Sequence, residues 1–184
     1  MNEIAATKSS LLILDVDETL LFATERRLAH APDFRFGPYH VYLRPYLQEF
    51  LQHCYRRYRI ALWSTADAGY LAVVRTYALP ADLHLEFVWS RDRCVRCYDP
   101  EWRETYYVKD LRKVRRHGFD LAKTLIVDDT PQKVERSYGN AIYVPEFRGE
   151  PEDDLLRRLA NYLEALADTA DVRGLEKRNW KAHY

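Results

Sequence analysis

The chain has 184 residues, 47% of them hydrophobic, and its formal net charge is +0. This length and hydrophobic content predict a single domain over residues 1–184 with a sizeable core. A neutral chain has no overall field that would attract nucleic acid or an anionic membrane. Three cysteines are too few for a disulfide framework, which favours a reducing compartment.

No segment predicts secretion or membrane insertion. No apolar run approaches the ~20 residues that a membrane-spanning helix needs. The N-terminal stretch MNEIAATKSS lacks the apolar core of a signal peptide. We therefore expect a cytoplasmic protein, or a nuclear one if the source is eukaryotic, that is neither secreted nor bound to a membrane.

The first predicted strand ends in two carboxylates. Residues 11–14 are apolar throughout, as in parallel strands that are covered on both faces. Asp15 and Asp17 follow at once, and both point to one side because side chains alternate with period two. In an open α/β sheet this edge binds ligands. A divalent cation such as Mg²⁺, which prefers oxygen ligands, would relieve the repulsion between the two acids.

Two other interpretations of this stretch were open. An EF-hand calcium loop needs Gly at its sixth position and Glu at its twelfth. Those positions hold Leu20 and Arg26, which excludes an EF-hand. A solvated turn with acids placed by chance is the other alternative, and one motif alone does not exclude it.

The following segment predicts a flap, a strand and a helix. Residues 20–29 fit either a helix or a loop. Residues 31–38 hold two prolines, a glycine and two phenylalanines, which indicates a structured loop or flap. Residues 39–43 are a candidate strand, and apolar residues at helical spacing from Leu47 to Cys54 predict a helix that faces the core.

The second buried strand is predicted at residues 60–63, and hydroxyl residues follow it. Ser64 and Thr65 stand just before a predicted helix that Pro80 ends. A hydroxyl group in this position can bind a phosphate oxygen together with backbone N–H groups at the helix start. An ordinary helix cap would use the same residue types.

Residues 91–107, RDRCVRCYDPEWRETYY, mix aromatic and basic side chains. Their Cys94-x-x-Cys97 pair would need two further ligands at a matching spacing to bind zinc, and neither a second cysteine pair nor paired histidines follow. We interpret the segment as a hairpin beside the active site. It either holds an extended or planar substrate or packs on the core.

A third buried strand, predicted at residues 125–127, also runs into acids. Asp128 and Asp129 follow it directly. Random surface turns do not usually place acids directly after an apolar strand twice in one chain. Between the hairpin and this strand, Lys109 is predicted to open a helix, although a surface lysine is the local alternative.

The C-terminal part predicts one more strand and a long helix. Residues 141–144 form the strand, and an amphipathic helix is predicted to begin at Pro151. In the polar tail that follows, Trp180 is expected to dock on the body. Because strands alternate with helices, the predicted fold is α/β: a doubly wound parallel, Rossmann-like sheet with helices on both faces. Acids from two strand ends, a hydroxyl and a lysine then converge at one edge.

The motifs DVDETL, WSTAD, YVKDL and VDDTP, in this order, resemble the haloacid dehalogenase superfamily. Within it the chain most resembles the small C-terminal-domain phosphatases, also called NLI-interacting-factor-like phosphatases, over residues 11–148. The resemblance implies a small β or loop insert between the second and third motifs and no large cap domain. The C-terminal helix and tail, residues 151–184, lie beyond the motif core.

The resemblance also implies roles. Asp15 would be the nucleophile that forms an aspartyl-phosphate, and Asp17 the general acid and base. Thr19 would order their loop. Ser64, with Thr65 as its competitor, would bind the phosphoryl group.

Lys109 would neutralise the phosphate charge and orient Asp15. Mg²⁺ would be held by Asp15, the backbone carbonyl of Asp17, and Asp128 or Asp129. The family's eukaryotic protein phosphatases commonly carry Asp-Asn at this last pair, so the choice between its two acids stays open.

The expected activity is that of a Mg²⁺-dependent phosphomonoesterase, with a phosphorylated protein as the favoured substrate. One alternative is a phosphatase of a small metabolite, a nucleotide or a polynucleotide end. The other is a catalytically silent module that binds a phospho-ligand or a protein, as in a mitochondrial translocase subunit with this fold. Intact Asp15, Asp17 and Lys109 argue against the silent module.

Overall fold

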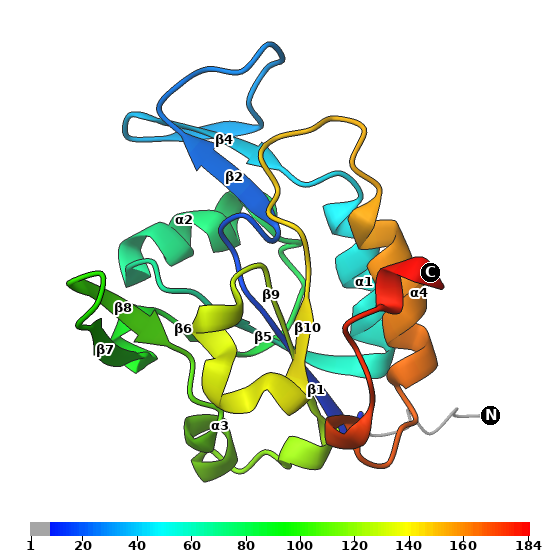
Figure 1. Cartoon of the computed structure of the whole chain (residues 1–184). Coiled ribbons are helices and arrows are strands. Elements are labelled where there is room, and N and C mark those ends of the chain that lie inside the picture. Colours follow the sequence, from blue (N-terminus) through cyan, green and yellow to red (C-terminus); the bar gives the residue numbers. More distant parts are fainter. Residues whose placement is uncertain (1–7) are drawn as a thin grey trace.

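A five-stranded parallel sheet forms the centre of the molecule. The computed structural model describes residues 8–184, so residues 1–7, on which the expected absence of a signal peptide depends, lie outside it. The sheet has the order β10-β9-β1-β5-β6, and every neighbouring pair is parallel. The strands are β1 (Ser10–Leu14), β5 (Tyr58–Trp63), β6 (Leu85–Trp89), β9 (Thr124–Asp128) and β10 (Ala141–Tyr143) (Figure 1).

Helices cover both faces of the sheet, which confirms the predicted α/β fold. In β1, Leu12 and Leu14 point into a core with α1 (Leu47–Arg57), α2 (Ala68–Ala78) and α4 (Leu155–Leu166). Leu11 and Ile13 point into a second core with α3 (Arg112–Arg116) and the 3-10 helix η3 (Pro131–Asn140). Because successive side chains alternate between the faces of a strand, one continuous apolar run fills both cores.

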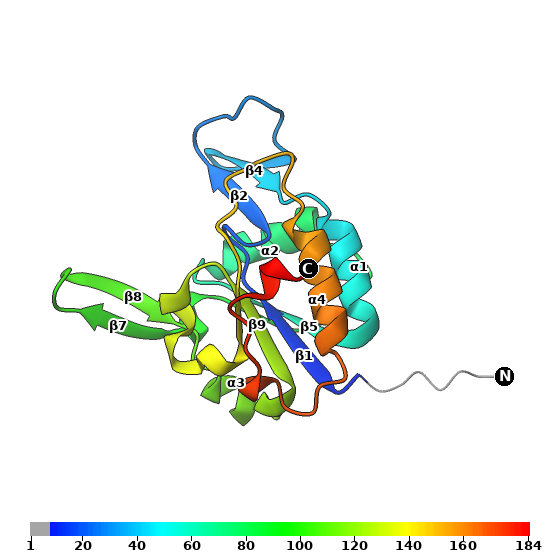
Figure 2. The same ribbon diagram turned by 45° about the vertical axis from the view of Figure 1, so that its right-hand side comes forward.

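A small antiparallel sheet stands beyond one end of the parallel sheet (Figure 2). It consists of β2 (Leu21–Thr24), β3 (Phe34–Phe36) and β4 (Tyr39–Leu43), in the order β2-β4-β3. The strand at 39–43 was predicted. Residues 20–29 were expected to form a helix or a loop, and this expectation is wrong because they contain β2. The predicted flap contains β3. β2 and β3 have only four and three residues, too few for a periodic sequence pattern. They are recognised as strands by their pairing with β4.

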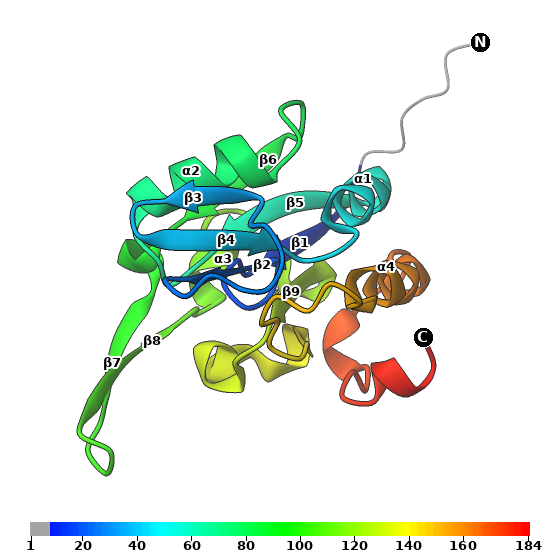
Figure 3. The ribbon, with the colours of Figure 1, turned by 90° about the horizontal axis from the view of Figure 1, so that it is seen from above.

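The insert between the second and third motifs is a hairpin, as predicted. Strand β7 (Val95–Asp99) pairs with β8 (Glu104–Val108) in a two-stranded antiparallel sheet, and the hairpin projects away from the body (Figure 3). Tyr106 and Cys97 of the hairpin contact Glu135 and Arg136 of η3, with 3.4 Å between the paired side-chain atoms in each case. The described residues contain no large cap domain.

Two predicted helix starts are wrong. Lys109 does not open a helix; it lies between β8 and α3, which begins at Arg112. Helix α4 begins at Leu155 and not at Pro151. The physical reason is Asp153, which accepts a hydrogen bond from the amide of Leu155 at 3.0 Å and pairs with the buried Arg44 at 2.8 Å, so residues 151–154 form the turn that leads into the helix.

The C-terminal tail packs on the body, as expected from its tryptophan. Trp180 is 3% exposed, stacks on Tyr162 with 5.4 Å between ring centroids, and donates a hydrogen bond to the carbonyl of Tyr143 at 3.1 Å. None of the helices in residues 8–184 combines the length and the apolar character required to span a bilayer.

Candidate active site

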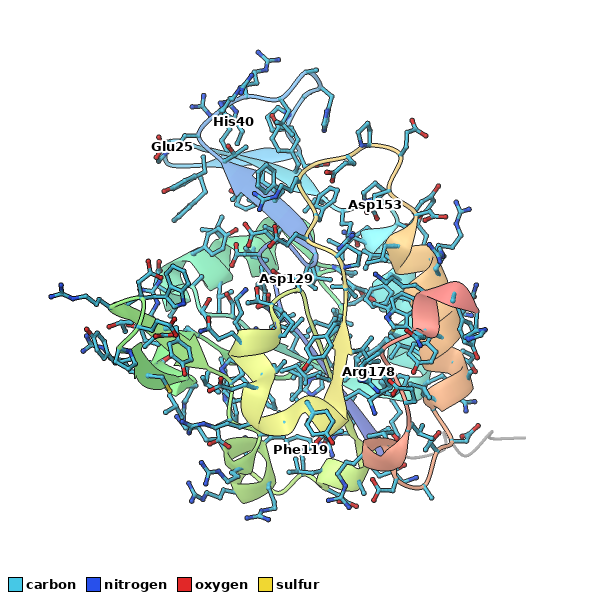
Figure 4. All side chains as sticks on the ribbon, viewed as in Figure 1. Glu25, His40, Phe119, Asp129, Asp153 and Arg178 are labelled. Carbon is cyan, nitrogen blue, oxygen red and sulfur yellow. The ribbon has the colours of Figure 1, made fainter. Side chains whose placement is uncertain are left out.

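The four motifs meet at the carboxyl ends of the parallel strands. Asp15 and Ser64 directly follow β1 and β5, Asp128 is the last residue of β9, and Lys109 directly follows β8. In Figure 4, Asp129 lies on the side of the parallel sheet that faces the antiparallel sheet. This is the edge at which open α/β folds bind ligands.

Asp15 is the centre of the cluster. Its carboxylate is 1% exposed. The ammonium group of Lys109, which is fully buried, lies 2.5 Å from Asp15 Oδ1 and 2.7 Å from Asp128 Oδ2. The hydroxyl of Thr19 lies 3.3 Å from Asp15 Oδ2 and 3.3 Å from Asp129 Oδ1, so it can donate its single hydrogen to either carboxylate. Thr19 therefore connects the first and last motifs.

The side chain of Asp17 has hydrogen-bond partners other than those of Asp15. Tyr70 donates its hydroxyl to Asp17 Oδ1 at 2.8 Å, and Ser64 donates to Asp17 Oδ2 at 3.1 Å. Ser64 is completely buried, and its oxygen also accepts the amide of Ala66 at 2.9 Å. The side chain of Asp17 is thus held by hydroxyl groups rather than by the partners of Asp15.

Of the two candidate hydroxyl residues after β5, only Ser64 uses its side chain inside the cluster. Thr65 contributes its backbone carbonyl, which accepts a hydrogen bond from Arg91 Nε at 2.6 Å. The carbonyl of Ser64 faces the thiol of Cys94 at 3.9 Å. Cys94 therefore packs beneath the second motif, and its thiol is free, as are those of Cys54 and Cys97.

Three carboxylates form a candidate metal site. One oxygen each from Asp15, Asp128 and Asp129 lie within 4.8 Å of one another, and no other such group of metal-ligating side chains occurs in residues 8–184. Oxygen-only donors suit Mg²⁺. The side chain of Asp17 does not belong to this set, and both acids of the last motif do.

Lys133 was not identified from the sequence. Its ammonium group lies 3.4 Å from Asp15 Oδ2 and 3.3 Å from Asp129 Oδ1, and its side chain is 19% exposed. Its spacing was the available signal, because Lys133 stands four residues after Asp129, in the 3-10 helix η3 that follows β9. No local pattern showed that the chain would bring this lysine back to Asp15.

The environment separates the pKa values of the first two acids. Burial by itself would raise the pKa of Asp15, but the ammonium groups of Lys109 and Lys133 outweigh it and lower that pKa. Burial, followed by the charge of Asp15, raises the pKa of Asp17, against the opposing hydrogen bonds from Tyr70 and Ser64. The cluster thus contains one carboxylate that stays ionised and one that tends to keep its proton.

The neighbouring acids carry raised pKa values. Burial and the charge of Asp15 raise the pKa of Asp128. Burial and the charge of Asp17 raise the pKa of Glu18 to about 7. Glu18 also has a φ of 56°, a conformation that is uncommon for a residue other than glycine and that marks the tight turn of the first motif. So many acids at one site favour a bound cation.

A parallel α/β sheet with these motifs at its carboxyl edge defines a domain of the haloacid dehalogenase type. The family model of the NLI interacting factor-like phosphatases matches residues 10–173. The chain therefore belongs to the NLI interacting factor-like phosphatase family.

Several named proteins are similar to the chain. It is 27% identical to CTD small phosphatase-like protein 3 of Caenorhabditis elegans over 96% of its own length and 61% of that protein. It is also 27% identical to CTD nuclear envelope phosphatase 1 of Xenopus laevis, over 99% of the chain and 77% of that protein. The mitochondrial import inner membrane translocase subunit TIM50 of Kluyveromyces lactis is 28% identical over 86% of the chain, which spans 32% of that subunit.

The solved structure of Fcp1, an essential RNA polymerase II CTD phosphatase, has a similar fold. The TM-score is 0.58 at 20% sequence identity, and the match covers 86% of this chain and 49% of that one. At this identity the match concerns the fold alone. It agrees with the parallel sheet and the absence of a large cap in residues 8–184.

Proposed function

We propose that this protein is a Mg²⁺-dependent phosphomonoesterase that works through an aspartyl-phosphate on Asp15. The observation that carries the proposal is the position of Asp15. Asp15 is buried, and its carboxylate pairs with the ammonium group of Lys109. Two further carboxylates lie beside it. Asp17, two residues later, is hydrogen-bonded to Tyr70 instead. A nucleophile and a separate acid, set apart by their environments, are the two groups that phosphoester hydrolysis requires.

The donor set supports a divalent cation. Asp15, Asp128 and Asp129 supply oxygen ligands within 4.8 Å of one another, and the backbone carbonyl of Asp17 is a further proposed ligand. When bound, such an ion would supply positive charge to the phosphoryl oxygens and the developing transition state. Mg²⁺ and Mn²⁺ carry the same charge, and oxygen ligands suit both ions.

Asp15 acts as the nucleophile because the two lysines keep it ionised. Its carboxylate oxygen attacks phosphorus, the bond between phosphorus and the ester oxygen breaks, and the phosphoryl group is then bonded to Asp15. The buried ammonium group of Lys109 holds Asp15 in position and offsets negative charge. The fixed hydroxyl of Ser64 is the proposed partner of a phosphoryl oxygen.

Asp17 moves the proton. Its raised pKa lets it hold a proton, which it transfers to the ester oxygen as that oxygen leaves. The resulting carboxylate takes a proton from the water that attacks the aspartyl-phosphate. Phosphate leaves, and Asp15 and the protonated Asp17 are regenerated. Tyr70 and Ser64 orient the carboxyl group for both transfers.

For the substrate we propose phosphoserine or phosphothreonine in a protein. The names of the C. elegans and Xenopus relatives, which call them phosphatases of a CTD type, support this choice. A small phosphorylated metabolite, a nucleotide or a polynucleotide end is the alternative within the same chemistry. The relative in the mitochondrial translocase favours a silent binding module as a second candidate, although the assembled cluster of Asp15, Asp17 and Lys109 argues for turnover.

The test is hydrolysis of an aryl phosphate with and without Mg²⁺, by the native protein and by Asp15→Asn. We expect metal-dependent turnover that Asp15→Asn abolishes, and Asp82→Asn, an exposed acid far from the motifs, serves as the matched control. Equal turnover by Asp15→Asn would rule out the nucleophile. No turnover by the native protein would favour the binding module. Phosphopeptides and phosphorylated nucleotides then compare the substrate classes.

We also propose that the protein acts in the cytoplasm. Its three free thiols suit a reducing compartment. Fractionation of cells that express the chain tests this proposal, and recovery with the membrane fraction would contradict it.

A further inference from the structure

Lys133 occupies the gap between two proposed metal ligands. Its ammonium group is within 3.4 Å of Asp15 Oδ2 and 3.3 Å of Asp129 Oδ1. Lys109 sits on the opposite side and contacts Asp15 Oδ1 and Asp128 Oδ2. The two lysines therefore contact different oxygens of Asp15, and Lys133 shares the oxygen that faces Asp129 with the hydroxyl of Thr19.

The two lysines differ in their freedom to move. Lys109 is fully buried, so its ammonium group has no route to water, whereas the side chain of Lys133 is 19% exposed. A lysine side chain is long and flexible and can carry its charged group to solvent while its stem stays packed. Lys133 can therefore leave the cluster, and Lys109 cannot.

A divalent cation and Lys133 would meet in the same place. Both are attracted by the same two carboxylates, and two cations this close repel each other strongly in a partly buried site. A lysine side chain is charged at neutral pH, so Lys133 has to move for the ion to enter.

We propose that Lys133 competes with the divalent cation for the gap between Asp15 and Asp129. Without the ion, Lys133 neutralises the repelling carboxylates and holds the first and last motifs together. The ion displaces it toward solvent. Lys133 consequently raises the concentration of metal that the site requires. This inference rests on the proposed function only in taking the three carboxylates as the metal site.

The first test measures metal affinity without any substrate. Mn²⁺ serves as the probe, and the electron paramagnetic resonance signal of the free ion is titrated with native protein and with Lys133→Gln. We expect Lys133→Gln to bind Mn²⁺ at least about tenfold more tightly, since one competing charge is removed. Lys133→Arg, which keeps the charge, should not gain affinity. Neither should Lys181→Gln, which removes a positive charge from the exposed tail.

The second test uses the native chain and so does not depend on a variant that folds. Amines are acetylated in a brief pulse with and without Mg²⁺, and the modification of each lysine is measured by peptide mass spectrometry. Release of Lys133 from its carboxylates should increase its labelling at least about threefold, because the amine leaves the ion pairs and becomes exposed to the reagent. Labelling of Lys181 should not change.

Equal or weaker binding of Mn²⁺ by Lys133→Gln, or labelling of Lys133 that Mg²⁺ does not increase, would overturn the competition. Neither measurement uses a phosphorylated substrate. A protein that fails to hydrolyse the aryl phosphate can therefore still show the competition, and an active phosphatase can still fail to show it.

Discussion

The backbone carbonyl of Lys133 accepts a hydrogen bond from the amide of Lys109 at 2.7 Å. This contact fixes the segment after β8 against the turn after β9. As a result, the ammonium groups of both residues reach the carboxylate of Asp15 from two directions. The proposed nucleophile is thus positioned by a main-chain contact between its two cationic neighbours.

Lys109→Met should destabilise the protein at neutral pH by about 3 to 5 kcal/mol, because it leaves Asp15 and Asp128 buried without their shared cation. Mg²⁺ should restore part of that loss, since the ion neutralises the same carboxylates. Urea unfolding with and without Mg²⁺ measures both effects. Lys181→Met is the control, and a similar loss in both variants would contradict the role of Lys109.

Tyr70→Phe should shift the pH dependence of hydrolysis upward. The hydroxyl of Tyr70 stabilises the ionised form of Asp17, so its removal raises the pKa of Asp17 further. The general acid then stays protonated to higher pH, and the alkaline limb of kcat/KM moves up by about one pH unit. The pH–rate profile measures this shift.

Tyr58→Phe is the matched control for that change. It removes a hydroxyl that donates to the carbonyl of Leu163 at 2.7 Å, on the far side of the α1–α4 core. Its profile should coincide with that of the native protein. A downward shift in Tyr70→Phe would exclude Asp17 as the acid that defines this limb.

Arg44→Met should weaken both the fold and the catalytic loop. The Arg44 side chain is 1% exposed and pairs with Asp153 at 2.8 Å. It also donates to the carbonyl of Thr19 at 3.0 Å. We expect a loss of about 3 kcal/mol, because Asp153 keeps its charge without a partner, together with reduced turnover as the loop that carries Asp17 loosens.

Chemical denaturation and the aryl phosphate assay measure the two effects of Arg44→Met. Arg57→Met, which removes an arginine from exposed ion pairs with Glu164 and Asp168, should cost clearly less stability. It should leave turnover unchanged. Equal losses in the two variants would show that Arg44 has no special role in the loop.

Asp110 should make a pH-dependent contribution to stability. Hydrogen bonds from Arg112, against the effect of burial, lower the pKa of Asp110 to about 2. A depressed pKa in the folded state stabilises the protein above the ordinary value of about 4, and this contribution disappears as pH falls through about 2. Asp110→Asn should therefore cost about 1 kcal/mol at pH 7 and progressively less below pH 4. Urea titrations at a series of pH values check this, and a cost that grows on acidification would contradict it.

The sequence alone determined the core of the fold and most of the candidate site. Apolar runs that end in Asp15 or Asp128 carry two signals at once, a strand covered on both faces and a cluster of acids at its carboxyl end. Both signals are local, so they can be recognised without knowing which segments pack against the strand. For Ser64 and Lys109 the local pattern also allowed an ordinary helix cap and a surface lysine, and the resemblance of their motifs to the family implied their roles. The helix predicted to open at Lys109 begins at Arg112.

Only the tertiary structure decided the contacts between segments that lie far apart along the chain. The pairing of Lys133 with Asp15, of Tyr70 with Asp17 and of Arg44 with Asp153 depends on strand register and on the path of loops. No local periodicity encodes either of these. The start of α4 shows the physical reason: Pro151 favours a helix start, yet Asp153 is drawn into the ion pair with Arg44, and the helix begins only after that contact has been made.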